Sequence, residues 1–299
     1  VQAHAHSTGD LVLQNLHQQE DKMALTEWNQ TLFDSVKLST PELIQYESTD
    51  GLTIEGWIMR PVDLEKGKKY PLVLQIHGGP HSVYGYGFQH EWQLMTSRGY
   101  SVLYLNPRGS QGYGEAFMQK VVGDWGGKDY EDLMNGVDYV LANYSFVDEQ
   151  NLFVTGASYG GYMTNMITAR TDRFRAASTQ NAVVNLYSMF GTSDIGFYFN
   201  SWQLGGADMW DDEETVMKFS PIRYARNVKT PTLILHNEKD YRCPMEQGEQ
   251  WYMALRRNGV QTKLVRFPDE SHGMASSGKP SHRIERLHHL IEWFDQYRD

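Results

Sequence analysis

The sequence predicts an α/β fold, with a mostly parallel central sheet, helices on both faces and an antiparallel hairpin at its N-terminal edge. Short apolar runs recur from about residue 42, segments of helical periodicity separate them, and an Asp50–Gly51 turn joins two strand-like segments. Apolar strands that alternate with helices are typical of a parallel sheet covered on both faces. Ligands of such sheets bind at the carboxyl ends of the strands, where we expect the site.

The edge hairpin is predicted from the segments on either side of Asp50–Gly51. In LTIEGWIMRP (Leu52–Pro61), apolar and polar residues alternate as in a half-exposed strand. ELIQYEST (residues 42–49) lies directly before the turn. Because an Asp-Gly pair between two such segments favours a hairpin, we expect these strands to pair.

The inner strands are predicted from short apolar runs, and the helices from apolar residues three or four positions apart. The runs are PLVLQIHGG from Pro71, SVLYLNPRG from Ser101, NLFVTG from Asn151, TLILHNEKD from Thr232 and TKLVRFPDE from Thr262. Two helical stripes consist of Tyr130, Leu133, Met134, Val137, Val140 and Leu141, and of Ile284, Leu287, Ile291 and Phe294. We expect both stripes to lie in the core.

Residues 1–36 differ from the rest of the chain. They are rich in Gln, His and Asn, with one short apolar run at Leu11–Leu13 and no long periodic segment. We therefore expect an appendage over residues 1–36 and one large domain over residues 37–299.

Composition and charge exclude several classes of protein. Hydrophobic residues make up 40% of the 299 and charged residues 21%, which indicates a folded globular chain. Lys and Arg number 27 against 37 Asp and Glu, and this net charge of −10 argues against a nucleic-acid surface or a polybasic membrane anchor. No apolar stretch approaches the roughly 20 residues of a membrane span, and no signal peptide is recognisable. A single cysteine, Cys243, favours a reducing, cytoplasmic compartment.

The sequence predicts no metal site. The N-terminal histidines His4, His6 and His17 have no cysteine or carboxylate among them at a ligand spacing. The chain contains no H-E-x-x-H motif, and a lone cysteine cannot build a thiolate site. Metallopeptidase chemistry is therefore not expected.

The stretch VTGASYG (Val154–Gly160) places a lone serine, Ser158, between glycines, after a predicted strand and before a predicted helix. Small neighbours allow a sharp strand-to-helix turn that leaves the hydroxyl exposed at the helix N-terminus. This context predicts a nucleophile elbow. Because a glycine-rich turn without function can carry the same string, the interpretation depends on a base and an acid elsewhere.

A serine nucleophile needs a general base, which in turn needs a carboxylate that orients it. In α/β-hydrolases these follow in the order Ser, acid, His. Asp240 and His272 each follow a predicted strand, so both are expected on the same rim as Ser158. Glu238 is a rival acid, and Asp269 is expected to brace the His272 loop.

An oxyanion hole needs two backbone N–H donors that point at the developing charge. One is expected from Tyr159, directly after the nucleophile. The other is expected from the glycines of HGGPHSVYGYG, which follow the predicted strand from Pro71. We choose Gly79, with an ordinary turn as the alternative.

Six segments of the chain resemble one known family. They are HGGPH, NPRGSQGYGEAF, DWGGKDYEDL, GASYGGYMT, PTLILHNEKDYRCPMEQGEQ and PDESHGM. In this order they are similar to the catalytic domain of the prolyl oligopeptidase family of serine peptidases, nearest its acylaminoacyl-peptidase branch, over residues 37–299. The resemblance implies an α/β-hydrolase fold, acyl transfer through serine and no cofactor.

The resemblance also implies that Arg242 faces the acyl or P2 carbonyl of the substrate, with a surface salt bridge as the alternative. Further substrate contacts are expected from aromatic and apolar groups near the rim, and the core is the alternative for most of them. The candidates for the wall of the S1 pocket are Tyr159, Tyr162, Val184 and Tyr187.

One departure from the family concerns residues 1–36. Members of the family usually carry an N-terminal β-propeller that covers the site and admits only short peptides. At most a remnant of its last blade fits in residues 1–36, and the chain begins at Val1 without a methionine, so we expect a piece of a longer protein. Exopeptidase and endopeptidase use both stay open.

We therefore expect a serine peptidase that cleaves short peptides or acyl-peptides, without nucleic-acid or membrane partners. Whether it forms a homo-oligomer is left open. A carboxylesterase that acts on small acyl esters is the alternative within the same chemistry. A catalytically silent binding domain, with the acidic run DMWDDEET (Asp208–Thr215) as its contact surface, is the alternative from another class.

Overall fold

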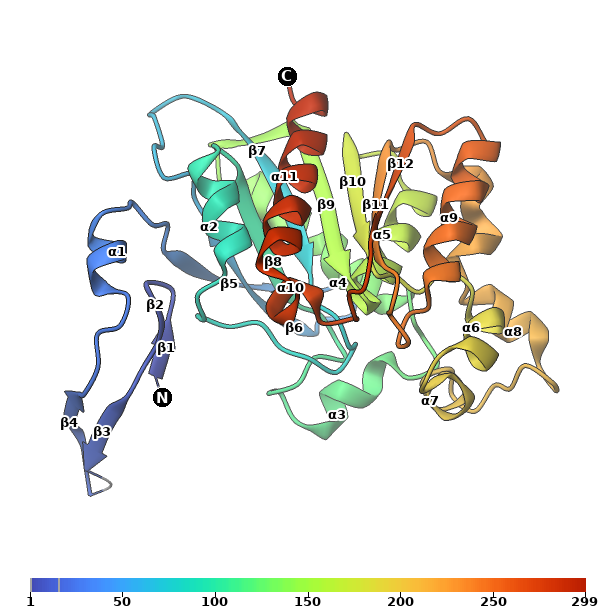
Figure 1. Cartoon of the computed structure of the whole chain (residues 1–299), viewed down its shortest axis with the longest axis horizontal. Helices are drawn as coiled ribbons and strands as arrows, with labels where there is room; N and C mark the ends of the chain where they lie inside the picture. The colour runs from blue at the N-terminus through green and yellow to red at the C-terminus, as the bar shows by residue number, and fades with distance from the viewer. Residues whose placement is uncertain (1, 16) are drawn as a thin grey trace.

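The computed structural model describes residues 2–15 and 17–299 and contains a central sheet of eight strands (Figure 1). The strand order across the sheet is β12-β11-β10-β9-β7-β8-β6-β5. The strands are β5 (Pro41–Glu47), β6 (Thr53–Met59), β7 (Tyr70–Ile76), β8 (Ser101–Asn106), β9 (Val147–Ala157), β10 (Ala176–Gln180), β11 (Thr232–Asn237) and β12 (Thr262–Phe267). This order, with neighbouring strands parallel from β8 to β12, is that of an α/β-hydrolase fold, as expected.

The predicted edge hairpin is confirmed. β5 and β6 pair antiparallel from Pro41 opposite Met59 to Glu47 opposite Thr53, and β6 continues antiparallel onto β8. Gly51 has a φ of +76°, a conformation that glycine adopts without strain in a tight turn. The Asp50–Gly51 pair therefore fixes the register of the edge.

Helices cover both faces of the sheet. α2 (His90–Ser97) and α11 (Pro280–Tyr297) pack on one face, and they lie in front of the sheet in Figure 1. α4 (Lys128–Asn143), α5 (Tyr159–Arg170) and α9 (Met245–Arg257) cover the other face. Strand residues alternate accordingly, because Val102 packs with α2 and α11 whereas Leu103 packs with α4 and α5.

The remaining helices are short. They are α1 (Gln30–Asp34), α3 (Glu115–Met118), α6 (Leu186–Thr192), α7 (Gly196–Gln203), α8 (Glu213–Lys218) and α10 (Met274–Ser277), with 3₁₀ turns η1 (Gln119–Val121) and η2 (Pro221–Asn227). α6, α7 and α8 lie together in the segment that connects β10 to β11. Figure 1 shows them beyond one end of the sheet.

The two predicted apolar stripes form core helices with one exception. Leu133, Val137 and Val140 of α4 are fully buried. In α11, Leu287, Ile291 and Phe294 are buried but Ile284 is 55% exposed. Ile284 therefore lies outside the core that its spacing predicted.

A buried arginine joins the hairpin to the opposite helix layer. Arg108, from the segment NPRG, pairs with Asp132 of α4 at 2.7 Å and with Asp50 of the hairpin turn at 2.9 Å. Both carboxylates and their hydrogen bonds hold the pKa of the arginine well above its usual range. Because the Arg108 charge is buried, its two carboxylate partners offset the cost of removing it from water.

The N-terminal segment contains two small antiparallel ladders that were not predicted. β1 (Gln2–His4) pairs with β2 (Ser7–Asp10), and β3 (Val12–Asn15) pairs with β4 (Gln18–Ala24). The segment contacts the main body through the Phe33 and Phe88 rings, whose centroids are 5.2 Å apart. The domain boundary after residue 36 stays a prediction.

Two absences concern the residues that the structure describes. No helix among them combines the length and the apolar composition that crossing a membrane requires. They also contain no cluster of three or more His, Cys, Asp or Glu side chains able to hold a metal ion.

Replacing Gly136 with alanine should destabilise the fold. Gly136 lies in α4, where a Cβ would overlap the Leu105 side chain and lie 2.6 Å from the Tyr46 hydroxyl oxygen. Such overpacking typically costs about 1–3 kcal/mol, which a denaturant titration would measure as a lower midpoint.

Gly191→Ala is the matched control for Gly136→Ala. Gly191 is also helical, in α6, but a Cβ there has no heavy atom within 4 Å. Alanine should therefore stabilise this helix by roughly 0.5–1 kcal/mol. Equal effects of the two substitutions would contradict the packing described for α4.

Candidate active site

Ser158 lies at the sharp turn between β9 and α5, in a strained backbone conformation. Its φ is 60° and its ψ is −122°. A non-glycine residue at positive φ costs on the order of 1–3 kcal/mol and persists only where its surroundings enforce it. Here the Ser158 N–H donates to the Gln180 carbonyl oxygen at 2.9 Å, and the Ser158 carbonyl accepts from Tyr162 N–H at 2.9 Å.

The glycines on either side of Ser158 are required by the close approach of three backbones. A Cβ on Gly156 would lie 2.7 Å from the Ile76 carbonyl oxygen, and one on Gly160 would lie 2.9 Å from that of His77. Real Cβ atoms do not approach so closely. The end of β7 is therefore pressed against the elbow, as the glycine pattern predicted.

Asp240 and His272 are brought together by neighbouring strand ends. Asp240 follows β11 and His272 follows β12, and the His272 Nδ1 lies 2.7 Å from the Asp240 Oδ2. Because the carboxylate can only accept, Nδ1 carries the proton in this contact. The other ring nitrogen, Nε2, is thereby left as the acceptor of the neutral imidazole.

The Asp240 carboxylate is buried and further fixed by its own loop. Its Oδ1 accepts N–H bonds from Arg242 at 2.9 Å and Cys243 at 2.8 Å. The loop of His272 is braced by Asn237, whose side-chain amide donates to the Ser271 carbonyl at 2.7 Å. Both side chains are therefore held before any substrate binds.

The two rival acids lie elsewhere. Glu238 pairs with Arg266 at 3.0 Å, and Asp269 pairs with Lys239 at 2.7 Å. Asp269 therefore connects the two loops through lysine and has no contact with the His272 ring among the described interactions.

The segment after β7 lies against the nucleophile. A Cβ on Gly78 would be 3.4 Å from Ser158 Cβ, and Gly79 has a φ of +119°. The N–H groups of Gly79 and Tyr159 donate no hydrogen bond to any other described residue. Burial lowers the pKa of His77 to about 4, so its neutral ring donates from Nδ1 to the Gly78 carbonyl at 2.7 Å and fixes this turn.

A cavity of about 380 Å³ opens beside Ser158. Ser158, His272, Tyr159, Gly79 and Arg242 all border it. Its apolar wall consists of Trp125, Val183, Met189, Ile195 and Phe199. We call it the catalytic cavity.

Arg242 borders the catalytic cavity and also forms an ion pair. Its Nε donates to Asp194 Oδ1 at 2.8 Å and its Nη2 to Asp194 Oδ2 at 3.3 Å. The carboxylate holds the pKa of the guanidinium above its usual range. The two interpretations of Arg242 are therefore compatible, because Asp194 engages only part of the guanidinium.

Three of the residues expected in the S1 wall do not border the catalytic cavity. Tyr162 and Val184 are fully buried in the core, and Tyr187 packs partly buried against it. Val183, one position away, borders the cavity instead. Among the residues of the apolar wall, only Trp125 belongs to a segment that resembles the family, DWGGKDYEDL.

Cys243 lies directly beside the nucleophile. Its Sγ is 3.9 Å from the Ser158 Oγ, and the side chain is 1% exposed. Burial raises the pKa of the thiol above its ordinary value. Its role here is that of a small apolar group in the cavity wall, which matches the expectation for a buried cysteine.

Tyr159 is anchored by a buried carboxylate. Its hydroxyl donates to Asp129 Oδ2, which also accepts the Gly126 N–H at 3.0 Å, and Asp129 Oδ1 accepts the Tyr130 N–H at 2.8 Å. Asp129 is fully buried, and desolvation raises its pKa to about 7. The residue after the nucleophile is thus tied to the N-terminus of α4.

Comparison with known families gives two matches. The profile of the prolyl oligopeptidase family matches residues 86–299, which include Ser158, Asp240 and His272. The profile of acetyl xylan esterase matches residues 10–127, which include Gly79.

Several relatives and solved structures are similar to the chain. The "uncharacterized peptidase YuxL" of Bacillus subtilis is 50% identical over 93% of the chain and 42% of the relative. Dipeptidyl-peptidase 5 of Schizosaccharomyces pombe is 32% identical over 86% of the chain and 37% of the relative. The acylaminoacyl peptidase structure of Pyrococcus horikoshii superposes with a TM-score of 0.94 and 34% identity over 99% of the chain and 47% of that protein. The chain thus spans less than half of the length of each.

The Asp129→Asn variant should lack a pH-dependent loss of stability that the wild type shows. The folded pKa of about 7 lies above the ordinary value of 3.8, so in this range the folded state binds more protons than the unfolded state. The stability contributed by this group is complete below pH 3.8 and is lost as the pH rises towards 7. Urea titrations across this range would measure the difference in slope.

Asp211→Asn, which removes an exposed carboxyl, is the control for Asp129→Asn. The free energy of unfolding of Asp211→Asn should change with pH in the same way as that of the wild type. Parallel curves for Asp129→Asn and the wild type would contradict the assigned shift, whatever the absolute stability of the variant.

Proposed function

The chain belongs to the prolyl oligopeptidase family of serine peptidases, and from this we propose that it hydrolyses short peptides or acyl-peptides through Ser158, His272 and Asp240. The resemblance seen in the six sequence segments is confirmed by the family match. One observation carries the proposal: a strained, partly buried serine shares a cavity with an imidazole whose Nδ1 lies 2.7 Å from a buried carboxylate.

In the first step the Ser158 hydroxyl oxygen attacks the scissile carbonyl carbon while His272 Nε2 takes its proton. Asp240, bonded to Nδ1, keeps the ring in the tautomer that can accept and stabilises the imidazolium that forms. The C–O bond to serine forms as the carbonyl π bond opens, and the charge moves to the carbonyl oxygen. The tetrahedral intermediate then carries an oxyanion.

The N–H groups of Tyr159 and Gly79 stabilise this oxyanion. Both lack other described acceptors, and both border the catalytic cavity. Removal of one such donor in comparable sites costs about 10²–10³ in kcat. The buried Asp129–Tyr159 contact and the neutral His77 hold the two donor segments in place.

Collapse of the intermediate breaks the bond to the leaving group, which takes the proton from His272. The acyl group stays on Ser158 as an ester. Water, deprotonated by His272, then attacks this ester, and the serine leaves with the proton returned by the imidazole. The cycle consumes one water and needs no cofactor.

The acyl part of the substrate fills the catalytic cavity. Trp125, Val183 and Phe199 give it an apolar, partly aromatic wall that suits a medium-sized apolar P1 side chain. Arg242, already oriented by Asp194, donates to a carbonyl of the acyl or P2 group. The relatives named acylaminoacyl peptidase and dipeptidyl-peptidase 5 support acylated or short N-terminal peptide segments as substrates.

A carboxylesterase is the second candidate. The match of the acetyl xylan esterase profile to residues 10–127 favours it, because this segment contains Gly79 and Trp125. Esters have better leaving groups than amides, and the same three side chains would serve.

The Ser158→Ala variant should lose nearly all hydrolysis of an acyl-amino-acid anilide. Loss of the nucleophile in comparable triads lowers kcat by about 10⁶. Ser97→Ala, at an exposed position in α2, should keep wild-type activity. Circular dichroism would check that both variants fold, and near-wild-type turnover of Ser158→Ala would refute the proposal.

A fluorophosphonate probe tests the same assignment and the silent binding domain. The probe should modify the peptide that contains Ser158 and no other. Absence of labelling in folded protein would favour the silent domain, whereas a different labelled peptide would displace Ser158 as the nucleophile.

An ester and an anilide that share one acyl-amino-acid group should both be hydrolysed. A peptidase must give its proton to a poor nitrogen leaving group, and the fixed His272–Asp240 pair supplies that proton. Steady-state kinetics on the two substrates would measure the ratio of their kcat/KM values. Turnover of the ester with no detectable turnover of the anilide would support the carboxylesterase instead.

A further inference from the structure

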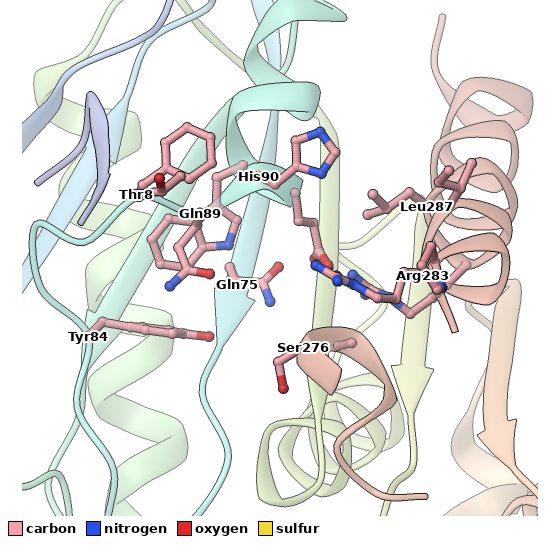
Figure 2. Close-up of a pocket in the computed structure, with 15 residues that line it drawn as sticks. Thr8, Gln75, Tyr84, Gln89, His90, Ser276, Arg283 and Leu287 are labelled. Carbon is pink, nitrogen blue, oxygen red and sulfur yellow. Dashed lines mark hydrogen bonds and ion pairs between the residues drawn. The ribbon is translucent and has the colours of Figure 1, made fainter. Parts of the chain in front are cut away.

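A second cavity lies between the N-terminal ends of α2 and α11, outside the catalytic cavity. Its volume is about 560 Å³, larger than the 380 Å³ beside Ser158. Figure 2 shows Gln89 and His90, at the start of α2, on one side and Arg283 and Leu287 of α11 on the other. We call it the α2–α11 cavity.

Three polar side chains on its walls have buried atoms without partners among the described residues: Gln75, Arg286 and Glu91. Gln75, from β7, is 8% exposed, and its Oε1 accepts no hydrogen bond from any described residue. Figure 2 shows Gln75 at the centre of the cavity. Arg286 is equally buried, and its Nε has no described partner. Such atoms are available to form hydrogen bonds with a ligand that enters the cavity.

The charges around the α2–α11 cavity leave a positive excess. Arg286 is neutralised by Glu91 at 2.6 Å, so this pair contributes no net charge. Arg283, exposed at the mouth, forms no ion pair within the described part of the chain. The N-terminal ends of both helices add partial positive charge. The site thus favours a carboxylate near Arg283.

Apolar groups complete the cavity next to Arg283. Phe88 and Trp92 line the cavity on the side of α2, and Leu287 and Ile284 line it on the side of α11. Leu287 is buried, whereas Ile284 is 55% exposed. Ile284 is the residue of the apolar stripe that the core does not cover. A ligand with an apolar side chain would cover it.

Residues that line the α2–α11 cavity are close along the chain to the proposed catalytic residues. Ala275 and Ser276 of α10 border it and follow His272 by three and four positions. Gln75 precedes Gly79 by four positions. His272 gives its proton to the leaving amine, so the leaving peptide extends from its side of the site. The two cavities share no lining residue, but the short chain from His272 to Ser276 keeps the α2–α11 cavity near the leaving-group side of the site.

We propose that the α2–α11 cavity binds the C-terminal part of the peptide substrate, with its terminal carboxylate at Arg283 and an apolar side chain against Ile284 and Leu287. The proposal rests on the proposed function, because it assigns the leaving-group side of the same reaction. Gln75 accepts a backbone N–H of this peptide. The guanidinium of Arg283, which has no ion-pair partner among the described residues, should favour a peptide with a free C-terminal carboxylate.

Kinetics of Arg283→Gln test the proposal. Three substrates with the same acyl part are compared: a short peptide with a free C-terminal carboxylate, the same peptide as its C-terminal amide, and an anilide. Loss of a hydrogen bond to a charged group should raise KM for the carboxylate peptide about 10-fold. KM for the amide and the anilide, and kcat for all three, should stay unchanged.

Arg256→Gln on α9 is the matched control, because Arg256 is also exposed and forms no described ion pair. Arg256→Gln should leave KM and kcat unchanged for all three substrates. Ile284→Asp removes an apolar contact and places a negative charge beside Arg283, so it should raise KM for both peptides, more for the carboxylate than for the amide, and leave the anilide unchanged. Both positions are on the surface, so the fold should tolerate them.

Two outcomes would overturn the proposal. Equal KM values of the wild type for the carboxylate and amide peptides would remove the basis for a carboxylate site. An unchanged KM of Arg283→Gln for the carboxylate peptide would remove Arg283 from it. In either case wild-type hydrolysis of the anilide would leave the proposed function standing, whereas its absence would refute that function independently.

Discussion

The site depends on one crowded backbone crossing, where the end of β7 touches the turn between β9 and α5. Ser158 has a strained backbone conformation at this crossing. Gly156 and Gly160 have no Cβ, which allows the turn to lie directly against the Ile76 backbone. The same contact brings the segment after β7 next to Ser158, so that Gly78 lies against the Ser158 side chain. The strain at Ser158 and the placement of the proposed second oxyanion donor segment therefore have a single cause. A side chain at either glycine would disturb both together.

The other catalytic groups reach this crossing because parallel strands end at one rim. β9, β11 and β12 lead into the proposed nucleophile, acid and base, and β10 lies between β9 and β11. Loops alone would not fix side chains to the precision that proton transfer needs. Here Asn237 holds the base loop, and two backbone N–H groups hold Asp240. The sheet sets the positions approximately, and these buried hydrogen bonds set them finely.

The sequence predicted most of the fold because its signals are local. Glycines around Ser158, the Asp50–Gly51 turn and the apolar strands each carry their own constraint. β10 was missed because AASTQ is short and polar, although all of its residues are buried between neighbouring strands. Of the four residues predicted for the S1 wall, only Tyr159 borders the catalytic cavity, because the direction of each side chain decides which residues line it. Val183 borders the catalytic cavity and Val184 does not, a difference of one position that composition does not encode.

Chemistry and specificity are carried by different parts of the chain. The reacting groups follow β7, β9, β11 and β12, whereas Met189, Ile195 and Phe199 of the catalytic cavity come from the α6–α7 segment. The outer side of that segment exposes Phe197 and Trp202 by 66% and 51%. A change there alters the shape offered to the acyl group without moving Ser158. The strand ends, by contrast, cannot vary without loss of the crossing at Ile76. We therefore expect relatives with different substrates to differ first between β10 and β11.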